Sequence, residues 1–215
     1  MRTAPPDNKF TSLTGVPVQY ARLPLAPYGT RGVKATWRAT PEFQAKIEAA
    51  FNELWTVCPL GEAELIVSAG FWVEKPGMHG LGRATDLDSI WWKDRTFVTK
   101  AEWETGGKTF YLAVEAILHK HFGVVLNYSY NIAHHDHFHI DDTDPPGFAR
   151  TARSECNFAQ AALNYVLDIP TLITGQYDNQ FRDSLHQANV GDLRKWSDWK
   201  AFLDRVAIVG FKNGT

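Results

Sequence analysis

The chain has few cysteines, almost no excess charge and no long apolar run. Its 215 residues include two cysteines, and neither belongs to a C-x-x-C pair, which excludes a cysteine-rich metal site. The 22 basic and 24 acidic residues give a net charge of −2, so there is no electrostatic basis for binding nucleic acid. No stretch approaches the roughly 18 apolar residues that span a bilayer, and the N-terminus lacks the apolar core of a secretory signal. We expect a soluble protein, made in the cytoplasm, that uses another route for any export.

The length allows one domain with a substantial core, or a domain of about 150 residues with a small appendage. A Pro-Gly break at residues 144–147 and a change in composition predict a boundary near residue 150. Residues 1–150 would form the first domain and residues 151–215 a helical C-terminal region. This region is near the lower size limit for independent folding, so docking on the first domain is the alternative. Cys58 and Cys156 could form one disulfide or remain buried thiols.

Hydrophobic spacing and capping residues predict several helices and three short strands. The first 38 residues are rich in Pro, Gly and Thr without periodicity, which predicts an extended arm over the surface. Thr40 as N-cap and Pro41 as first helical residue begin a helix. Further helices are expected at 108–122, 155–167, 178–188 and 197–209, and strands at 65–67, 124–128 and 137–141. The last two strands would pair as an antiparallel hairpin with the loop 129–136.

Residues 134–141 (HHDHFHID) hold four of the eight histidines. Clustered imidazoles seldom serve packing, because each needs a hydrogen-bond partner once it leaves water. On a β-strand, alternation places His135, His137 and His139 on one face and the apolar Phe138 and Ile140 on the other. The polar face of such a strand could hold a metal ion.

A second candidate string lies about 50 residues earlier, at residues 79–86 (HGLGRATD). It offers one imidazole, His79, and one carboxylate, Asp86, on a loop that Gly80 and Gly82 would let wrap around an ion. Together with His139 they form a ligand set of two histidines and one carboxylate, which leaves the fourth zinc position open for water. Zinc so held makes hydroxide available near neutral pH, as a hydrolase requires.

Hydrolysis also needs a proton carrier beside the metal. His137 shares the predicted strand face with His139 and could serve as general acid–base or polarise the developing oxyanion. Asp136 is the rival base, although alternation aims it away from the metal unless the strand begins later. His134 could enter the same pocket from the loop. Asp141 lies two residues after His139 and so on the same predicted strand face. It could orient a ligand imidazole by a hydrogen bond to the ring nitrogen that does not bind the metal.

These strings carry a resemblance to a known superfamily. The string His79-x-x-Gly82-x-Ala84-x-Asp86 resembles the metal motif of zinc D-alanyl-D-alanine carboxypeptidases, and Gly82-Arg83-Ala84-x-Asp86 is closest to the extensin-like C-terminal members. The string His134-x-x-His137-x-His139 is similar to the second motif of penicillin-insensitive murein endopeptidases, relatives of lysostaphin-type enzymes and hedgehog signalling domains. The resemblance covers roughly residues 62–142. It implies zinc bound by His79, Asp86 and His139, with His137 assisting and His134 nearby.

Relatives carry a catalytic glutamate three residues before the last ligand, where this chain has Asp136, so the resemblance keeps both candidate bases open. The resemblance also implies an α+β fold, with a small antiparallel sheet and flanking helices, and peptide bonds of bacterial peptidoglycan as substrate. Relatives commonly have an arginine soon after the strand that precedes the first histidine, to hold a substrate carboxylate, but residues 68–72 (SAGFW) have none. This favours an endopeptidase over a D,D- or L,D-carboxypeptidase. Arg83 and Ser68 are the candidate substrate-binding residues.

The C-terminal region has a loose similarity to three-helix peptidoglycan-binding modules at residues 158–178. A wall hydrolase without a signal peptide would suit an endolysin released by a holin, or an antibacterial effector delivered by a secretion machine and paired with an immunity protein. Either would act in the periplasm or cell wall, and we expect a monomer. The alternative class is a binding module that holds zinc for structure and recognises the wall or a partner without turnover.

Overall fold

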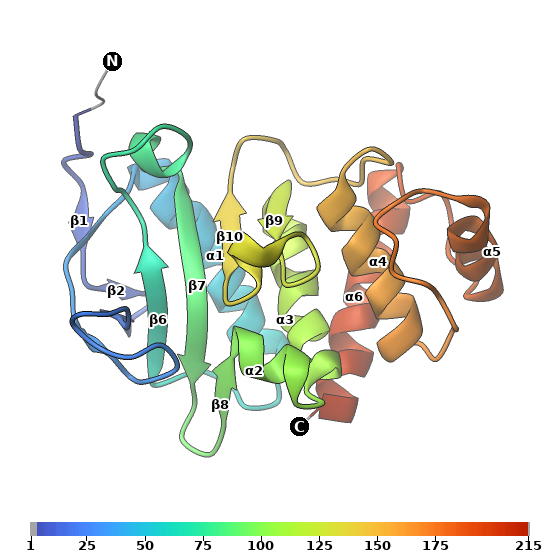
Figure 1. The fold of residues 1–215 in the computed structure, drawn as a ribbon, viewed down its shortest axis with the longest axis horizontal. Helices are drawn as coiled ribbons and strands as arrows, with labels where there is room; N and C mark the ends of the chain where they lie inside the picture. Colours follow the sequence, from blue (N-terminus) through green and yellow to red (C-terminus); the bar gives the residue numbers. More distant parts are fainter. Residues whose placement is uncertain (1–3, 215) are drawn as a thin grey trace.

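The computed structural model describes residues 4–214 and has an α+β architecture, shown in Figure 1. The strands are β1 (Lys9–Phe10), β2 (Ser12–Leu13), β3 (Val16–Tyr20), β4 (Val33–Lys34), β5 (Trp37–Arg38), β6 (Leu65–Gly70), β7 (Ala84–Trp91), β8 (Thr96–Val98), β9 (Val124–Leu126) and β10 (Phe138–Asp141). The α-helices are α1 (Pro41–Val57), α2 (Thr99–Glu104), α3 (Lys108–His121), α4 (Arg153–Tyr165), α5 (Asn179–Gln187) and α6 (Trp196–Gly214). Two 3-10 turns are η1 (His79–Leu81) and η2 (Ile132–His134). The predicted fold class is therefore confirmed.

The main sheet is larger than predicted and is mixed. Its strands lie in the order β2-β3-β6-β7-β10-β9, with β4 beside β3 and β8 beside β7, while β1 and β5 form a separate pair. Strand β3 runs parallel to β6, whereas the remaining pairs are antiparallel. The prediction of a small antiparallel sheet was wrong at this pair, because the Pro- and Gly-rich segment that contains β3 was interpreted as an arm outside the sheet.

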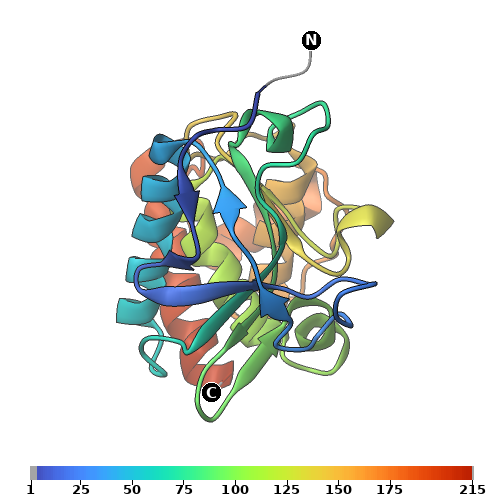
Figure 2. The same cartoon turned by 90° about the vertical axis from the view of Figure 1, so that its left-hand side faces the viewer.

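Helices α1 and α3 cover one face of the sheet, and the turn η2 lies on the opposite face (Figures 1 and 2). Helix α1 begins as predicted, with the Thr40 hydroxyl accepting a hydrogen bond from the Phe43 amide and Pro41 at the first position. On β10 the Phe138 ring packs against Tyr111 of α3 at 4.5 Å between ring centroids. The alternation along β10 therefore sends His139 to the face that the helices leave uncovered.

The C-terminal helices pack on the first part of the chain. Gly210 of α6 crosses α3 so closely that a Cβ there would lie 2.6 Å from the Thr109 carbonyl oxygen. Buried side chains from both parts belong to one hydrophobic core, which includes Phe110 of α3 and Phe211 of α6. This arrangement matches the alternative in which the tail docks on the first domain. The boundary near residue 150 stays a prediction.

The prediction that the N-terminal arm extends over the surface was wrong for strand β3. Val16 and Val18 of β3 are buried, and their alternation with the exposed Pro17 is the period-two signal of a strand. The arm then turns back through residues 21–32 to β4. Because β3 pairs with β6, residues that follow Tyr20 come close to the uncovered face of the sheet.

The hairpin of β9 and β10 is confirmed, since His139 pairs with Leu126 and Asp141 with Val124. The loop assigned to residues 79–86 is only partly a loop. His79 belongs to η1, whereas Asp86 lies within the strand β7, directly opposite His139. Gly82 has a left-handed φ of 69° that ends the turn η1 and redirects the chain into β7.

Two further expectations concern the cysteines and membranes. Cys58 and Cys156 are both buried and free, so the thiol alternative is the one found. Among residues 4–214, no helix combines the length and apolar character needed to cross a bilayer.

Candidate metal centre

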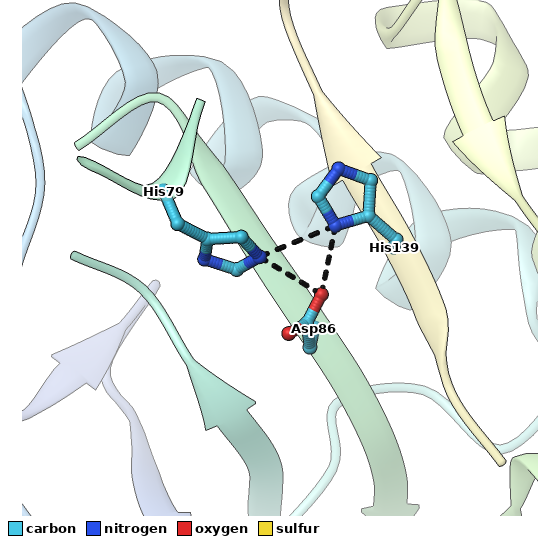
Figure 3. Close-up of side chains that lie close together, drawn as sticks. All are labelled: His79, Asp86 and His139. Atoms are coloured by element: carbon cyan, nitrogen blue, oxygen red, sulfur yellow. Dashed lines mark hydrogen bonds and ion pairs between the residues drawn. The ribbon is translucent and has the colours of Figure 1, made fainter. Parts of the chain in front are cut away.

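His79, Asp86 and His139 converge on the uncovered face of the sheet, as Figure 3 shows. The Nε2 atom of His79 lies 3.1 Å from Oδ1 of Asp86 and 3.2 Å from Nδ1 of His139. The third distance, from Nδ1 of His139 to Oδ1 of Asp86, is 2.9 Å. Three potential ligand atoms thus form a nearly equilateral triangle. The predicted convergence of these residues is confirmed.

The other nitrogen of each imidazole is already engaged. Nδ1–H of His79 donates to the carbonyl oxygen of Phe71 at 2.6 Å. Nε2–H of His139 donates to Oδ2 of Asp141 at 3.1 Å, and Asp141 is itself held by the Thr143 amide at 2.8 Å. Because these partners only accept hydrogen bonds, a neutral ring must present its unprotonated nitrogen to the triangle. Two lone pairs and a carboxylate oxygen then face one another, an arrangement that a cation at their centre would stabilise.

The electrostatics of the triangle follow from this crowding. Burial would raise the pKa of Asp86, but hydrogen bonds from His139 and His79 lower that pKa far below its ordinary value. Burial works against a charged imidazole, yet hydrogen bonds to Asp141 and Asp86 raise the pKa of His139 to about 9. Without a metal ion, both ring nitrogens of His139 are therefore protonated at neutral pH. The resulting positive charge partly offsets the negative charge of the neighbouring carboxylates.

The triangle fits a tetrahedral metal. Ligand atoms about 2.0–2.1 Å from a tetrahedral zinc ion lie about 3.3 Å apart, close to the 2.9–3.2 Å found here. His79 is 3 % exposed, whereas Asp86 and His139 are partly open to solvent. These three residues could therefore hold a metal ion with one side left accessible.

His137 lies beside the triangle. Its Nε2 atom is 3.6 Å from Oδ1 of Asp86, and its Nδ1–H donates to Oδ1 of Asp136 at 2.7 Å. Strand β10 begins only at Phe138, so alternation does not govern Asp136, whose carboxylate turns toward His137 instead of away from the site. The two candidate bases are therefore hydrogen-bonded partners, and His137 is the one that faces Asp86.

The remaining histidines of the cluster divide between the site and solvent. The ring of His134 lies 5.3 Å from that of His137 and 5.8 Å from that of His139, measured between centroids. Burial lowers the pKa of His134 to about 4, and both neighbouring imidazoles act in the same direction. His135 is partly exposed, and its Nδ1–H donates to the Ile132 carbonyl. The prediction that His135 shares a strand face with His137 was wrong, because both residues precede the strand.

Sequence reasoning missed three residues that hold Asp136, and it also missed Asp88, which anchors one of them. The Arg22 guanidinium binds Asp136 Oδ2 through Nη1, and grips the Asp88 carboxylate through Nε at 2.9 Å and Nη2 at 2.6 Å. The hydroxyls of Tyr28 and Thr99 both donate to the backbone carbonyl of Asp136, at 2.7 and 2.6 Å. Asp88 could have been found, since it is two residues from Asp86 and shares its strand face. Nothing in the local sequence marks Arg22 or Tyr28, because the fold alone brings the arm to the site.

These partners shift the ionisation of both carboxylates. Burial raises the pKa of Asp88 to about 7, against the opposing effect of the Arg22 guanidinium. Burial would also raise the pKa of Asp136, but hydrogen bonds from Arg22 and His137 lower it to about 2. Asp136 is therefore ionised at neutral pH and can hold His137 by a charge-assisted hydrogen bond.

The two candidate substrate-binding residues lie outside the triangle. Arg83 is half-exposed and its Nε–H donates to Oδ1 of Asp142 at 2.8 Å, so it ties β7 to the end of β10. Ser68 is 1 % exposed, and its hydroxyl bonds within the sheet to Thr85. A role for Ser68 in contacting substrate does not fit this burial.

Part of the chain is similar to a known protein family. A family model described as extensin-like protein C-terminus matches residues 70–153, which is less than half of the 215 residues. The matched segment contains the whole triangle and the cluster around His137, but not the arm that carries Arg22. No curated protein and no solved structure matches the chain.

Proposed function

We propose that this protein is a zinc-dependent peptidase that cleaves peptide crosslinks in bacterial peptidoglycan. The observation that carries the proposal is the convergence of His79, Asp86 and His139 within 3.2 Å of one another, with His137 beside them. A ligand set of two imidazoles and one carboxylate is typical of catalytic zinc sites. The match to the extensin-like C-terminal family model supports the extensin-like part of the resemblance, and the link from there to wall peptidases is part of the proposal.

Zinc bound at these atoms would supply Lewis acidity and make water a nucleophile near neutral pH. The residues of the chain do the rest. Phe71 and Asp141 hold the two ligand imidazoles from behind and fix which nitrogen faces the metal. Asp136 does the same for His137, because its carboxylate accepts from Nδ1–H and leaves Nε2, which points toward Asp86, as the unprotonated nitrogen of a neutral ring. His137 can then take a proton from the attacking water and return it to the leaving amine.

The paired state of the nearby arginines favours an internal peptide bond as the target. A carboxypeptidase must hold the free carboxylate of its substrate, most effectively with a bidentate arginine. Arg22 already binds two carboxylates, and Arg83 binds the Asp142 side chain and backbone carbonyl. An endopeptidase, whose substrate continues on both sides of the cleaved bond, has no such requirement.

The setting of the activity is proposed from the same resemblance. The enzyme would act in the periplasm or cell wall, after release as an endolysin or delivery as an effector. The C-terminal helices would then keep it near the wall. The hydrogen bond between Asp136 and His137 favours catalysis over a purely structural zinc module, since a structural ion has no use for an oriented imidazole outside its ligand set.

Digestion of purified peptidoglycan tests the proposal directly. Zinc-loaded protein should release muropeptides in which a peptide bond has been hydrolysed, as identified by mass spectrometry, and a chelator should stop the reaction until zinc is restored. His139→Ala should be inactive and zinc-free, whereas Asp142→Asn, which changes a carboxylate that points away from the triangle, should retain activity. Peptide hydrolysis that survives complete metal removal would falsify the zinc mechanism.

A further inference from the structure

Arg22 stands at the point where the N-terminal arm leaves the sheet. It follows the strand β3 by two residues, and its side chain is 25 % exposed. Its partner Asp88 has a fully buried side chain on β7, where both carboxylate oxygens accept from the guanidinium. A bidentate bond to a buried, rigid carboxylate fixes the plane of the guanidinium. Arg22 is therefore anchored to the same strand that carries the metal ligand Asp86.

From this anchor the remaining nitrogen, Nη1, reaches Oδ2 of Asp136. The other oxygen of Asp136 accepts from Nδ1 of His137 at 2.7 Å. The backbone carbonyl of Asp136 is held by the hydroxyls of Tyr28, from the arm, and Thr99. One line of hydrogen bonds thus runs from the sheet through Arg22 and Asp136 to the imidazole that faces the triangle.

We propose that Arg22 is a positioning residue that orients His137 through Asp136, so the N-terminal arm is a working part of the site. This inference rests on the proposed function for its consequence in turnover, but not for the orientation itself. His137 needs such support because it precedes β10 and lies at the end of the long connection after β9, where no strand pairing fixes its backbone. A side chain there keeps one orientation only if its partners are themselves fixed.

A direct role for Arg22 in gripping substrate does not fit its contacts. Nε and Nη2 bind Asp88, and Nη1 binds Asp136. The guanidinium face lies 4.8 Å from the centre of the Tyr28 ring. Every nitrogen of the group is engaged, and a substrate carboxylate would have to displace a partner.

The alternative is that Arg22 only stabilises the fold through its ion pairs. Arg95 is the matched control that separates this alternative from a positioning role. The Arg95 side chain is 23 % exposed, binds Glu102 and the Gly214 carbonyl, and stacks on Phe110, away from the triangle. Replacing either arginine removes a half-buried cation and its hydrogen bonds. Only the Arg22 replacement should change the state of His137.

The test compares Arg22→Met and Arg22→Lys with Arg95→Met in the full chain. In zinc-free protein, long-range proton–nitrogen NMR reports which ring nitrogen of His137 carries the proton, with His137→Gln assigning the signals. We expect wild type and Arg95→Met to show a single tautomer protonated at Nδ1. Arg22→Met should show a mixture of tautomers, with zinc affinity within about threefold of wild type. Arg22→Lys, which cannot bind both carboxylates in the same geometry, should lie between the two.

In the zinc-loaded protein, Arg22→Met should lower kcat by about 10–100-fold with KM within about threefold, because the proton carrier is misaligned while substrate contacts persist. An unchanged His137 tautomer in Arg22→Lys and Arg22→Met, or equal losses in Arg95→Met, would overturn the proposal. If Arg22→Met fails to fold, Arg22→Lys decides the outcome. Should wild type show no hydrolysis, the proposed function fails, and the NMR comparison still decides whether Arg22 orients His137.

Discussion

Replacing Asp141 by asparagine should weaken zinc binding, although Asp141 does not belong to the triangle. Oδ1 of Asp141 accepts from the Thr143 amide at 2.8 Å, and Oδ2 accepts from His139 Nε2 at 3.1 Å. In the asparagine variant the Thr143 amide still requires an acceptor, so the side-chain NH₂ takes the place of Oδ2. Nε2 of His139 must then accept a hydrogen bond, and the ring proton moves to Nδ1. That proton points into the triangle, where the metal would bind.

The expected loss of zinc affinity is about 10–100-fold, the usual cost of losing the partner behind a ligand imidazole, or about 1.4–2.7 kcal/mol. The value should lie toward the upper end, because the variant both removes the negative charge and reverses the tautomer. Competition against a zinc-binding dye at pH 7 measures the affinity, and circular dichroism verifies that the variant is folded.

Asp142→Asn is the control for this prediction. It makes the same chemical change one residue further along, on a carboxylate that binds Arg83 instead of an imidazole. Its zinc affinity should stay within about twofold of wild type. If Asp141→Asn binds zinc as tightly as wild type, or if both variants lose affinity equally, the inferred tautomer of His139 is wrong.

Three further predictions address turnover, metal binding and stability. His137→Ala should keep zinc affinity within about threefold of wild type, measured by zinc titration, and lower turnover about 10²-fold or more, measured by muropeptide release. If the variant loses zinc, His137 is a metal ligand and not a proton carrier. Zinc at 100 times its Kd should stabilise the fold by about 2.7 kcal/mol and raise Tm by about 5–10 °C in a thermal scan, and His139→Ala should show no shift. Burial raises the pKa of Glu155 from its ordinary value of 4.5 to about 7, so the folded chain binds more protons than the unfolded chain between these pH values. This contribution to stability is therefore lost as the pH rises from about 4.5 to 7. Glu155→Gln should therefore gain up to about 3 kcal/mol over wild type at pH 8 and much less at pH 5 in urea unfolding, and an equal difference at both pH values would contradict the shift.

Elements with a local signal were predicted well. Thr40 and Pro41 mark the start of α1, and the structure places both as expected. The hairpin of β9 and β10 was found from two short apolar runs separated by a polar loop. The convergence of His79, Asp86 and His139 was also predicted, because the composition of the two strings left little other use for those side chains.

Elements that depend on distant partners were not predicted. Residues 84–86 of strand β7 were predicted as part of the loop that carries His79 and Asp86, because they follow Gly80 and Gly82, and the rest of the strand was not predicted. Strand β3 was missed because Pro17 and the flanking glycines outweighed the alternation of Val16 and Val18. Each strand gains its stability from pairing with β6, a contact that local sequence does not encode.

The charge of the site explains why the arm belongs to it. Two hydrogen-bonded groups meet at the triangle: Arg22, a permanent cation, joins Asp88 to Asp136 and so to His137, and His139 joins Asp86 to Asp141. The two groups approach each other where His137 Nε2 lies 3.6 Å from Asp86 Oδ1. Carboxylates this close repel one another strongly when partly buried, and each needs a cation nearby to remain ionised. A divalent metal held by the triangle would offset the charge of Asp86 and of Asp141, which binds the ligand His139, whereas Asp88 and Asp136 are not among the triangle's ligand atoms. Arg22 offsets the charge of Asp88 and Asp136, because its guanidinium binds both carboxylates. The segment matched by the family model contains all four acids without this arginine, so the electrostatic balance of the site depends on a residue that only the folded arm can deliver.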